Sequence, residues 1–142
     1  MQLQTLRYER ADTPAGQVAT ITFDEQGSPV NTMCLQWQHD MAAVTQQVVN
    51  DRDAIKGLIL ASAKTTFFAG ADLKGVMRMT AADAPRVYAE IERIKACFRT
   101  LETLGIPVVS CINGSALGGG MEVALIGHHR IAVDDATLQL GL

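Results

Sequence analysis

The sequence lacks several features that would assign it to a specialised class of protein. Its 142 residues include only 3 cysteines and 4 prolines, and aromatic residues make up only 5%. Hydrophobic residues account for 48% and charged residues for 19%, which is the composition of an ordinary globular protein rather than a disordered one. A chain of this length can bury roughly 70% of its unfolded surface in one core, and it is too short for a second full domain.

The low cysteine content excludes a disulfide framework. Cys34, Cys97 and Cys111 are odd in number and widely separated, and none belongs to a CxxC arrangement that would support a zinc site. Each lies among apolar residues, so we expect three small buried side chains. A reducing, cytoplasmic location is the expectation.

Long apolar runs and an excess of basic residues are also missing. No run of about 18 apolar residues occurs, so no membrane-spanning helix is expected. The N-terminal region has no basic start followed by an apolar block, which argues against a secretory signal. The formal charge of −3 argues against a nucleic-acid-binding protein, which would normally present a basic surface.

The sequence does contain alternating strand and helix patterns. Residues 18–23, 55–61, 107–112 and 131–133 have the composition of strands, and 55–61 suits the centre of a sheet. A capping pair, Thr80 and Asp83, predicts the start of one helix, and residues 121–126 form a short apolar one. Two longer helices are predicted by apolar residues at 3–4 spacing: Cys34, Trp37, Met41, Val44, Val48; and Val87, Ile91, Ile94, Phe98, Leu101. This alternation predicts an α/β fold.

Two glycine-containing turns, at residues 67–73 and 113–122, each follow a predicted buried strand. If the two strands are neighbours, both turns meet at the same edge of the sheet. Small residues there let backbone N–H groups approach a ligand closely, and two converging N–H groups could stabilise a negatively charged oxygen. The alternative is that the segments are simply two tight turns.

Other phosphate-binding and nucleophile motifs do not match. A Walker loop requires Lys and Ser or Thr after its last glycine, but Gly120 precedes Met121. A dinucleotide fingerprint requires a glycine where Val123 stands. A nucleophile elbow requires a glycine two residues before Ser115, where Asn113 stands.

Glu122 lies one turn into an otherwise apolar helix. A carboxylate in that position either points to solvent or lies in a cavity, where it could transfer protons. His128 and His129 are adjacent, so their side chains point to opposite faces of an extended chain and could not readily share one metal ion. We expect a structural or surface role for them, and no metal site.

Residues 69–73 (AGADL), together with residues 106–109 (IPVV) and 113–122 (NGSALGGGME), closely resemble the crotonase superfamily of enoyl-CoA hydratases and isomerases. Residues 29–33 (PVNTM) resemble the early CoA-contacting segment of that family. The match runs from about residue 5 to the last residue. It is most similar to the N-terminal hydratase domain of multifunctional fatty-acid-oxidation alpha subunits.

The resemblance implies a spiral of ββα units and the binding of an acyl-CoA thioester. It implies that the backbone N–H groups of Ala69 and Gly119 hold the thioester oxygen. CoA is then part of the substrate, and no separate cofactor is expected. The substrate-binding residues implied are Val30, Ala69, Gly70, Ala71, Asp72, Leu73, Gly118 and Gly119. Lys64, Lys74 and Arg78 are candidates to bind the CoA phosphates.

Glu122 matches the first of two catalytic glutamates in the hydratases of the family. The resemblance therefore implies hydration of trans-2-enoyl-CoA to 3-hydroxyacyl-CoA in fatty-acid β-oxidation. The second glutamate would follow Leu142 in a Pro-Glu pair. Residues 1–142 are therefore expected to form the N-terminal part of a hydratase domain, without its C-terminal helices and with little activity alone.

Two other functions stay open. The chain could belong to a family member that isomerises enoyl-CoA or hydrolyses a thioester, because all of these reactions share the oxyanion hole. It could also be a non-catalytic CoA-binding module. The resemblance implies a homo-trimer or hexamer, or a thiolase subunit as partner in a multifunctional complex.

Overall fold

The computed structural model describes residues 3–142 and contains a five-stranded sheet with the order β1-β2-β3-β4-β6. β1 (Leu6–Thr13) pairs antiparallel with β2 (Gly16–Phe23). β3 (Ile55–Ser62), β4 (Val108–Ile112) and β6 (His129–Ala132) continue the sheet in parallel. The predictions that residues 55–61 lie at the sheet centre and neighbour residues 107–112 are confirmed.

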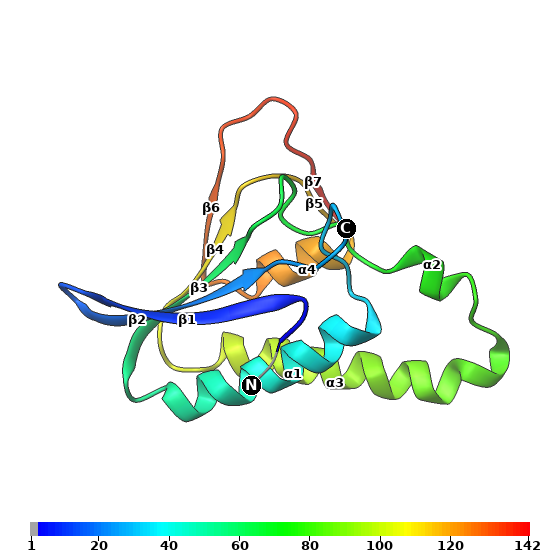
Figure 1. The fold of residues 1–142 in the computed structure, drawn as a ribbon, viewed down its shortest axis with the longest axis horizontal. Helices are drawn as coiled ribbons and strands as arrows, with labels where there is room; N and C mark the ends of the chain where they lie inside the picture. The colour runs from blue at the N-terminus through cyan, green and yellow to red at the C-terminus, as the bar shows by residue number, and fades with distance from the viewer. Residues whose placement is uncertain (1–2) are drawn as a thin grey trace.

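Alternate residues of the strands share one buried face. The register places Ile21 beside Leu60 and Leu58 beside Val108, and all four side chains are buried. α1 (Leu35–Asp51) and α3 (Ala84–Glu102) pack against each other below the sheet, as Figure 1 shows. Both helices contribute side chains to the core, because their apolar residues recur on one side.

The helix starts follow the sequence signals. The Sγ of Cys34 accepts a hydrogen bond from the N–H of Trp37 and caps α1. Thr80 and Asp83 form the predicted capping box before a short 3₁₀ turn, Ala81–Asp83, which leads into α3. α2 (Leu73–Val76) is a single turn that lies away from the sheet in Figure 1.

A second, smaller row of strands lies beside the main sheet. β5 (Ala116–Leu117) pairs with β7 (Leu140–Gly141), and Phe68 forms an isolated bridge to Ala116. The same arrangement therefore occurs three times along the chain. β3, β4 and β6 lie in the main sheet, and each is followed by a short extended segment in the second row: Phe68, β5 and β7. α4 (Gly119–Leu125) follows β5 and packs Val123 and Ala124 into the core.

Three details of the sequence prediction need correction. β1 was not predicted, because the exposed charged residues of this edge strand obscure its alternation. The strand predicted at 131–133 is β6, which spans His129–Ala132. Val87 and Ile91 are absent from the core of the described chain, and Ile91 is 52% exposed. In residues 3–142 there is no helix with the length and apolarity needed to cross a bilayer.

Candidate active site

The two glycine-containing turns meet at the carboxyl edge of β3 and β4, as the sequence predicts. The N–H groups of Phe67 and Phe68 both donate to the carbonyl of Ser115, at 3.1 and 3.3 Å. In return, the N–H of Leu117 donates to the carbonyl of Phe68 at 3.3 Å. Main-chain hydrogen bonds therefore join the turn after β3 directly to the turn after β4.

Glycine allows this close approach. Gly70 has a φ of +99°, and a β-carbon there would lie 2.7 Å from the carbonyl oxygen of Leu117 and 3.5 Å from the backbone nitrogen of Gly119. A β-carbon on Gly114 would overlap the carbonyl oxygen of Thr65. The turns can touch only because these positions carry no side chain.

The main-chain N–H groups of the first turn have distinct roles. The N–H of Ala69 donates to the carbonyl of Asn31 at 2.9 Å, so it is already used within the protein. The assignment of Ala69 as an oxyanion donor is therefore corrected. Within residues 3–142, no acceptor is found for the N–H of Ala71 or of Gly119. Of the three residues 69, 70 and 71, only Ala71 lines the adjoining cleft.

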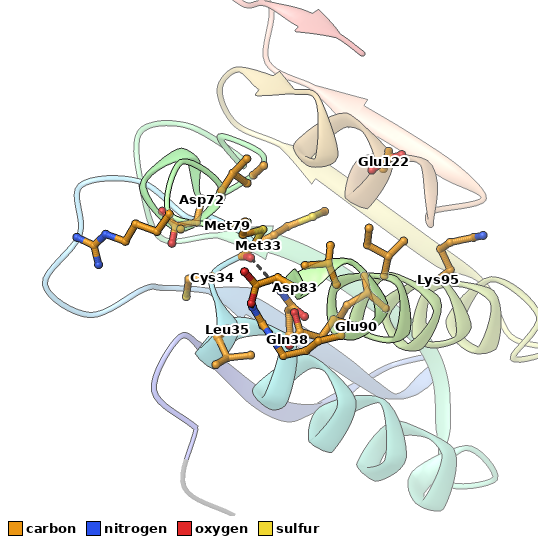
Figure 2. A pocket seen from close by; sticks show the side chains of 18 of the residues that line it. Met33, Cys34, Leu35, Gln38, Asp72, Met79, Asp83, Glu90, Lys95 and Glu122 are labelled. Carbon is orange, nitrogen blue, oxygen red and sulfur yellow. Dashed lines mark hydrogen bonds and ion pairs between the residues drawn. The ribbon is translucent and has the colours of Figure 1, made fainter. Parts of the chain in front are cut away.

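A cleft of about 720 Å³ opens beside Ala71 and Glu122. Its walls come from the segment entering α1, from α2, from α3 between Arg86 and Phe98, and from Glu122 of α4. Figure 2 shows Glu122 on α4 at one side, Met33 near the centre, Asp83 just before the start of α3, and Glu90 and Lys95 along that helix. The space is large enough for a small-molecule ligand.

Glu122 and Met33 lie close to Gly119. A β-carbon built on Gly119 would be 2.7 Å from both the Sδ and the Cε of Met33, and 3.6 Å from the Oε2 of Glu122. The Glu122 side chain is exposed to the cleft, and no hydrogen bond engages its carboxylate in the described part of the chain. Glu122 is therefore both exposed and a lining residue of the cleft.

The charged residues at the α3 end of the cleft are paired with one another. Arg86 contacts Asp83 at 3.1 Å and Glu90 at 2.8 Å. The hydrogen bond from the N–H of Thr80, followed by that from Arg86, holds the pKa of the Asp83 carboxyl below its usual range. This end of the cleft is therefore polar, whereas Val87, Ile91 and Ile94 make the adjacent wall apolar.

The other predicted binding residues are distributed around the turns. Asp72 lines the cleft beside Ala71, whereas Leu73 is 70% exposed at the start of α2. Gly70 is buried, and its carbonyl accepts from the N–H of Met33 at 2.9 Å. Gly118 has a φ of +52° and donates its N–H to the carbonyl of Gly141.

Val30 is half-buried and does not line the cleft. The first lining residue along this segment is Met33. Lys64 forms an ion pair with Asp24 at 3.0 Å and is only 17% exposed, so it is poorly placed to bind a phosphate. Arg78 lines the cleft, and Lys74 is exposed on α2. Arg78 and Lys74 therefore stay candidates.

Sequence reasoning did not predict the contribution of α3 to the cleft. Val87 and Ile91 follow the same 3–4 spacing as the buried residues of the helix. This spacing does not distinguish a residue that packs in the core from one that lines a cleft. The only distinguishing signal is the group of charged residues around them, Asp83, Arg86 and Glu90.

The cysteine and histidine predictions have different outcomes. Cys97 is buried, but Cys34 and Cys111 are only partly buried. Burial raises the pKa of the Cys34 thiol, so this cleft residue is not a ready thiolate nucleophile. His128 is structural, since its Nδ1 accepts from the N–H of Val108 and its Nε2 lies 2.8 Å from the carbonyl of Glu102. No group of three or more potential metal ligands occurs in residues 3–142.

The family model for enoyl-CoA hydratase/isomerase matches residues 13–141. The chain belongs to this family. Among curated relatives of the family, the fatty acid oxidation complex subunit alpha of Shewanella amazonensis is 36% identical over 126 residues. That of Shewanella baltica is 37% identical over 127 residues. Each match covers 88% of this chain but only 17% of the relative.

Solved structures of other proteins share the fold. An enoyl-CoA hydratase from Bacillus anthracis superposes with a TM-score of 0.79 and 28% identity, covering 96% of this chain and 50% of that chain. Pseudomonas aeruginosa DspI gives a TM-score of 0.79 and 27% identity, covering 98% of this chain and 53% of that chain. The chain therefore spans about half the length of these structures and has the predicted α/β crotonase fold.

Proposed function

We propose that the full-length protein is an enoyl-CoA hydratase that adds water to trans-2-enoyl-CoA. The observation that supports this most directly is the junction of the two turns. Two N–H groups without an acceptor in residues 3–142, those of Ala71 and Gly119, lie at this junction, and Ala71 and Glu122 both line the adjoining cleft. The thioester of acyl-CoA carries the carbonyl oxygen that such donors would stabilise.

In the proposed reaction, the N–H groups of Ala71 and Gly119 both donate to the thioester oxygen. Polarisation of the carbonyl makes C3 electrophilic, and the negative charge that develops on the oxygen is stabilised by fixed dipoles. Each such donor contributes on the order of 3 kcal/mol to the transition state. Gly119 also begins α4, so the positive end of the helix dipole adds to this effect.

Glu122 is proposed to accept a proton from the attacking water. The hydroxyl then bonds to C3, the C2–C3 double bond is lost, and C2 receives a proton. The product is 3-hydroxyacyl-CoA, so the atoms of substrate and water are all retained. The second acid–base group is proposed to lie beyond Leu142. The proposal needs no cofactor other than the CoA of the substrate, and trimers, hexamers or a thiolase partner stay predictions.

Crotonyl-CoA hydration by the full-length protein and by Glu122→Gln tests the assignment. We expect kcat to fall by roughly 10²–10⁴-fold in the variant, which is the usual contribution of a general acid or base. Thermal stability should not change, because the Glu122 side chain is exposed. An unchanged rate would rule out Glu122 as the base. Turnover of 3-enoyl-CoA but not 2-enoyl-CoA would favour an isomerase instead.

A further inference from the structure

Asn31 lies directly beneath the first turn, and its side chain is fully buried. Its Nδ2 lies 2.9 Å from the Oγ of Ser62, 3.2 Å from the carbonyl oxygen of Phe67 and 3.4 Å from that of Phe23. Its Oδ1 accepts from the N–H of Glu25 at 3.0 Å. One amide therefore connects the ends of β2 and β3 with the turn.

The main chain of the same segment holds the turn from one side. The carbonyl of Asn31 accepts from the N–H of Ala69, and two residues later the N–H of Met33 donates to the carbonyl of Gly70, both at 2.9 Å. The carbonyl of Ser115 holds the turn from the other side. The residue that comes next is Ala71, whose N–H has no acceptor in residues 3–142.

We propose that Asn31 is a positioning residue for the oxyanion hole. Its side chain fixes the backbone of residues 31–33, which fixes residues 69 and 70 and thereby directs the N–H of Ala71. This inference rests on the proposed function, because it takes the N–H of Ala71 to be a donor to the thioester oxygen. It also gives the N–H of Ala69 a role, which is to anchor the turn rather than to bind substrate.

The chemistry of a buried amide supports this role. A fully buried primary amide destabilises the fold unless its hydrogen bonds are satisfied, and an apolar side chain of similar size would pack there without that requirement. A satisfied polar network instead fixes one geometry. Oxyanion donors require such fixed geometry, since a displacement of about 1 Å can cost roughly 100-fold in rate.

Two variants of the full-length protein test the proposal. Asn31→Leu removes all the side-chain hydrogen bonds and keeps the branched shape of the side chain, although leucine is the larger residue. Ser62→Ala leaves Asn31 in place and removes one partner of its amide, together with the bonds of the Ser62 hydroxyl to the carbonyl of Thr66 and the N–H of Lys64. The matched control is Asp40→Asn, which alters another buried side chain with several hydrogen bonds, to Gln4, Thr5 and Gln36. Asp40 contacts neither turn through these bonds.

The readout is the absorption of a bound 3-aryl-2-enoyl-CoA, which moves to longer wavelength when the thioester carbonyl is polarised. We expect this red shift to decrease in Ser62→Ala and more strongly in Asn31→Leu. The kcat for crotonyl-CoA should fall by roughly tenfold and 100-fold respectively. Asp40→Asn should lower the melting temperature and leave both the red shift and kcat unchanged.

A folded Asn31→Leu protein with the wild-type red shift and kcat would overturn the inference. If Asn31→Leu does not fold, Ser62→Ala decides, and an unchanged red shift there overturns it equally. A loss of red shift in Asp40→Asn would also contradict it, because general destabilisation would then explain the effect. Absence of a red shift in the wild-type protein would instead refute the proposed function.

Discussion

The carbonyl oxygen of Phe68 occupies the place that a β-carbon on Gly120 would need. Gly120 is buried in the first turn of α4, and Phe68 lies near the start of the glycine-containing turn at residues 67–73. The glycine therefore sets how closely α4, which carries Glu122, approaches the other turn.

We predict that Gly120→Ala destabilises the fold by about 2 kcal/mol, because backbone must move to admit the methyl group. Urea unfolding measures this loss. Gly141→Ala is the matched control, since a β-carbon there meets no atom within 4 Å. Equal stability of the two variants would show that the contact between Phe68 and Gly120 is not rigid.

An aromatic cluster supports the same turn from below. The ring of Phe68 is 5.4 Å from that of Phe23 and 5.1 Å from that of Trp37, both in edge-to-face arrangements. We predict that Phe68→Ala lowers the free energy of unfolding by about 4 kcal/mol, because it leaves a cavity in a buried cluster. Phe98→Ala should cost clearly less, since Phe98 is only partly buried. Similar losses in thermal denaturation would contradict this ranking.

Asp40 makes the free energy of unfolding depend on pH. Burial alone would raise the pKa of this carboxyl, but the hydrogen bonds from Thr5, Gln4 and Gln36 outweigh it and hold the pKa below its ordinary value. Because the folded pKa is depressed, the stabilisation is fully present above the unfolded pKa of about 4 and is lost as pH falls through the folded value.

We predict that Asp40→Asn is less stable than wild type by about 2 kcal/mol at pH 7, since buried donors lose their charged acceptor. The difference should shrink as the pH falls below about 4, where the carboxyl of the unfolded wild-type chain becomes protonated, and should be smallest below the depressed folded pKa. Urea unfolding at a series of pH values measures both stabilities. A difference that stays constant down to pH 2 would contradict the assignment.

Local sequence patterns were sufficient to predict the strands and helices that have one apolar side. Trp37, Met41 and Val44 lie at helical spacing and are all fully buried in α1. The meeting of the two turns was also predictable, because parallel neighbouring strands end at the same edge. The edge strand β1 was not predictable in this way, since its exposed residues carry the charges.

A sequence motif does not by itself identify which N–H group is the oxyanion donor. The motif at residues 69–73 identifies the turn, but it does not say which N–H is used internally. That depends on Asn31, a residue far from the motif in sequence, whose carbonyl engages Ala69. Similarly, Ile91 has the spacing of a core residue but faces the cleft, because nothing in the described chain packs over it.

Two substitutions at Gly119 separate the effect of losing the backbone N–H from the effect of adding a side chain. It is the first residue of α4, the position in a helix that best tolerates proline, and proline lacks the N–H. A β-carbon there meets the flexible end of the Met33 side chain and lies at ordinary contact distance, 3.6 Å, from the Oε2 of Glu122. Gly119→Ala adds that carbon and keeps the N–H, whereas Gly119→Pro removes the donor.

We predict that kcat for crotonyl-CoA hydration by the full-length protein is roughly 10²–10³-fold lower in Gly119→Pro than in Gly119→Ala, the range expected for one oxyanion donor. Melting temperatures should be similar, because no protein acceptor in residues 3–142 loses a hydrogen bond. The red shift of a bound aryl-enoyl-CoA should persist in the alanine variant and decrease in the proline variant. Equal kcat values in two folded variants would show that the Gly119 N–H does not contact the thioester oxygen.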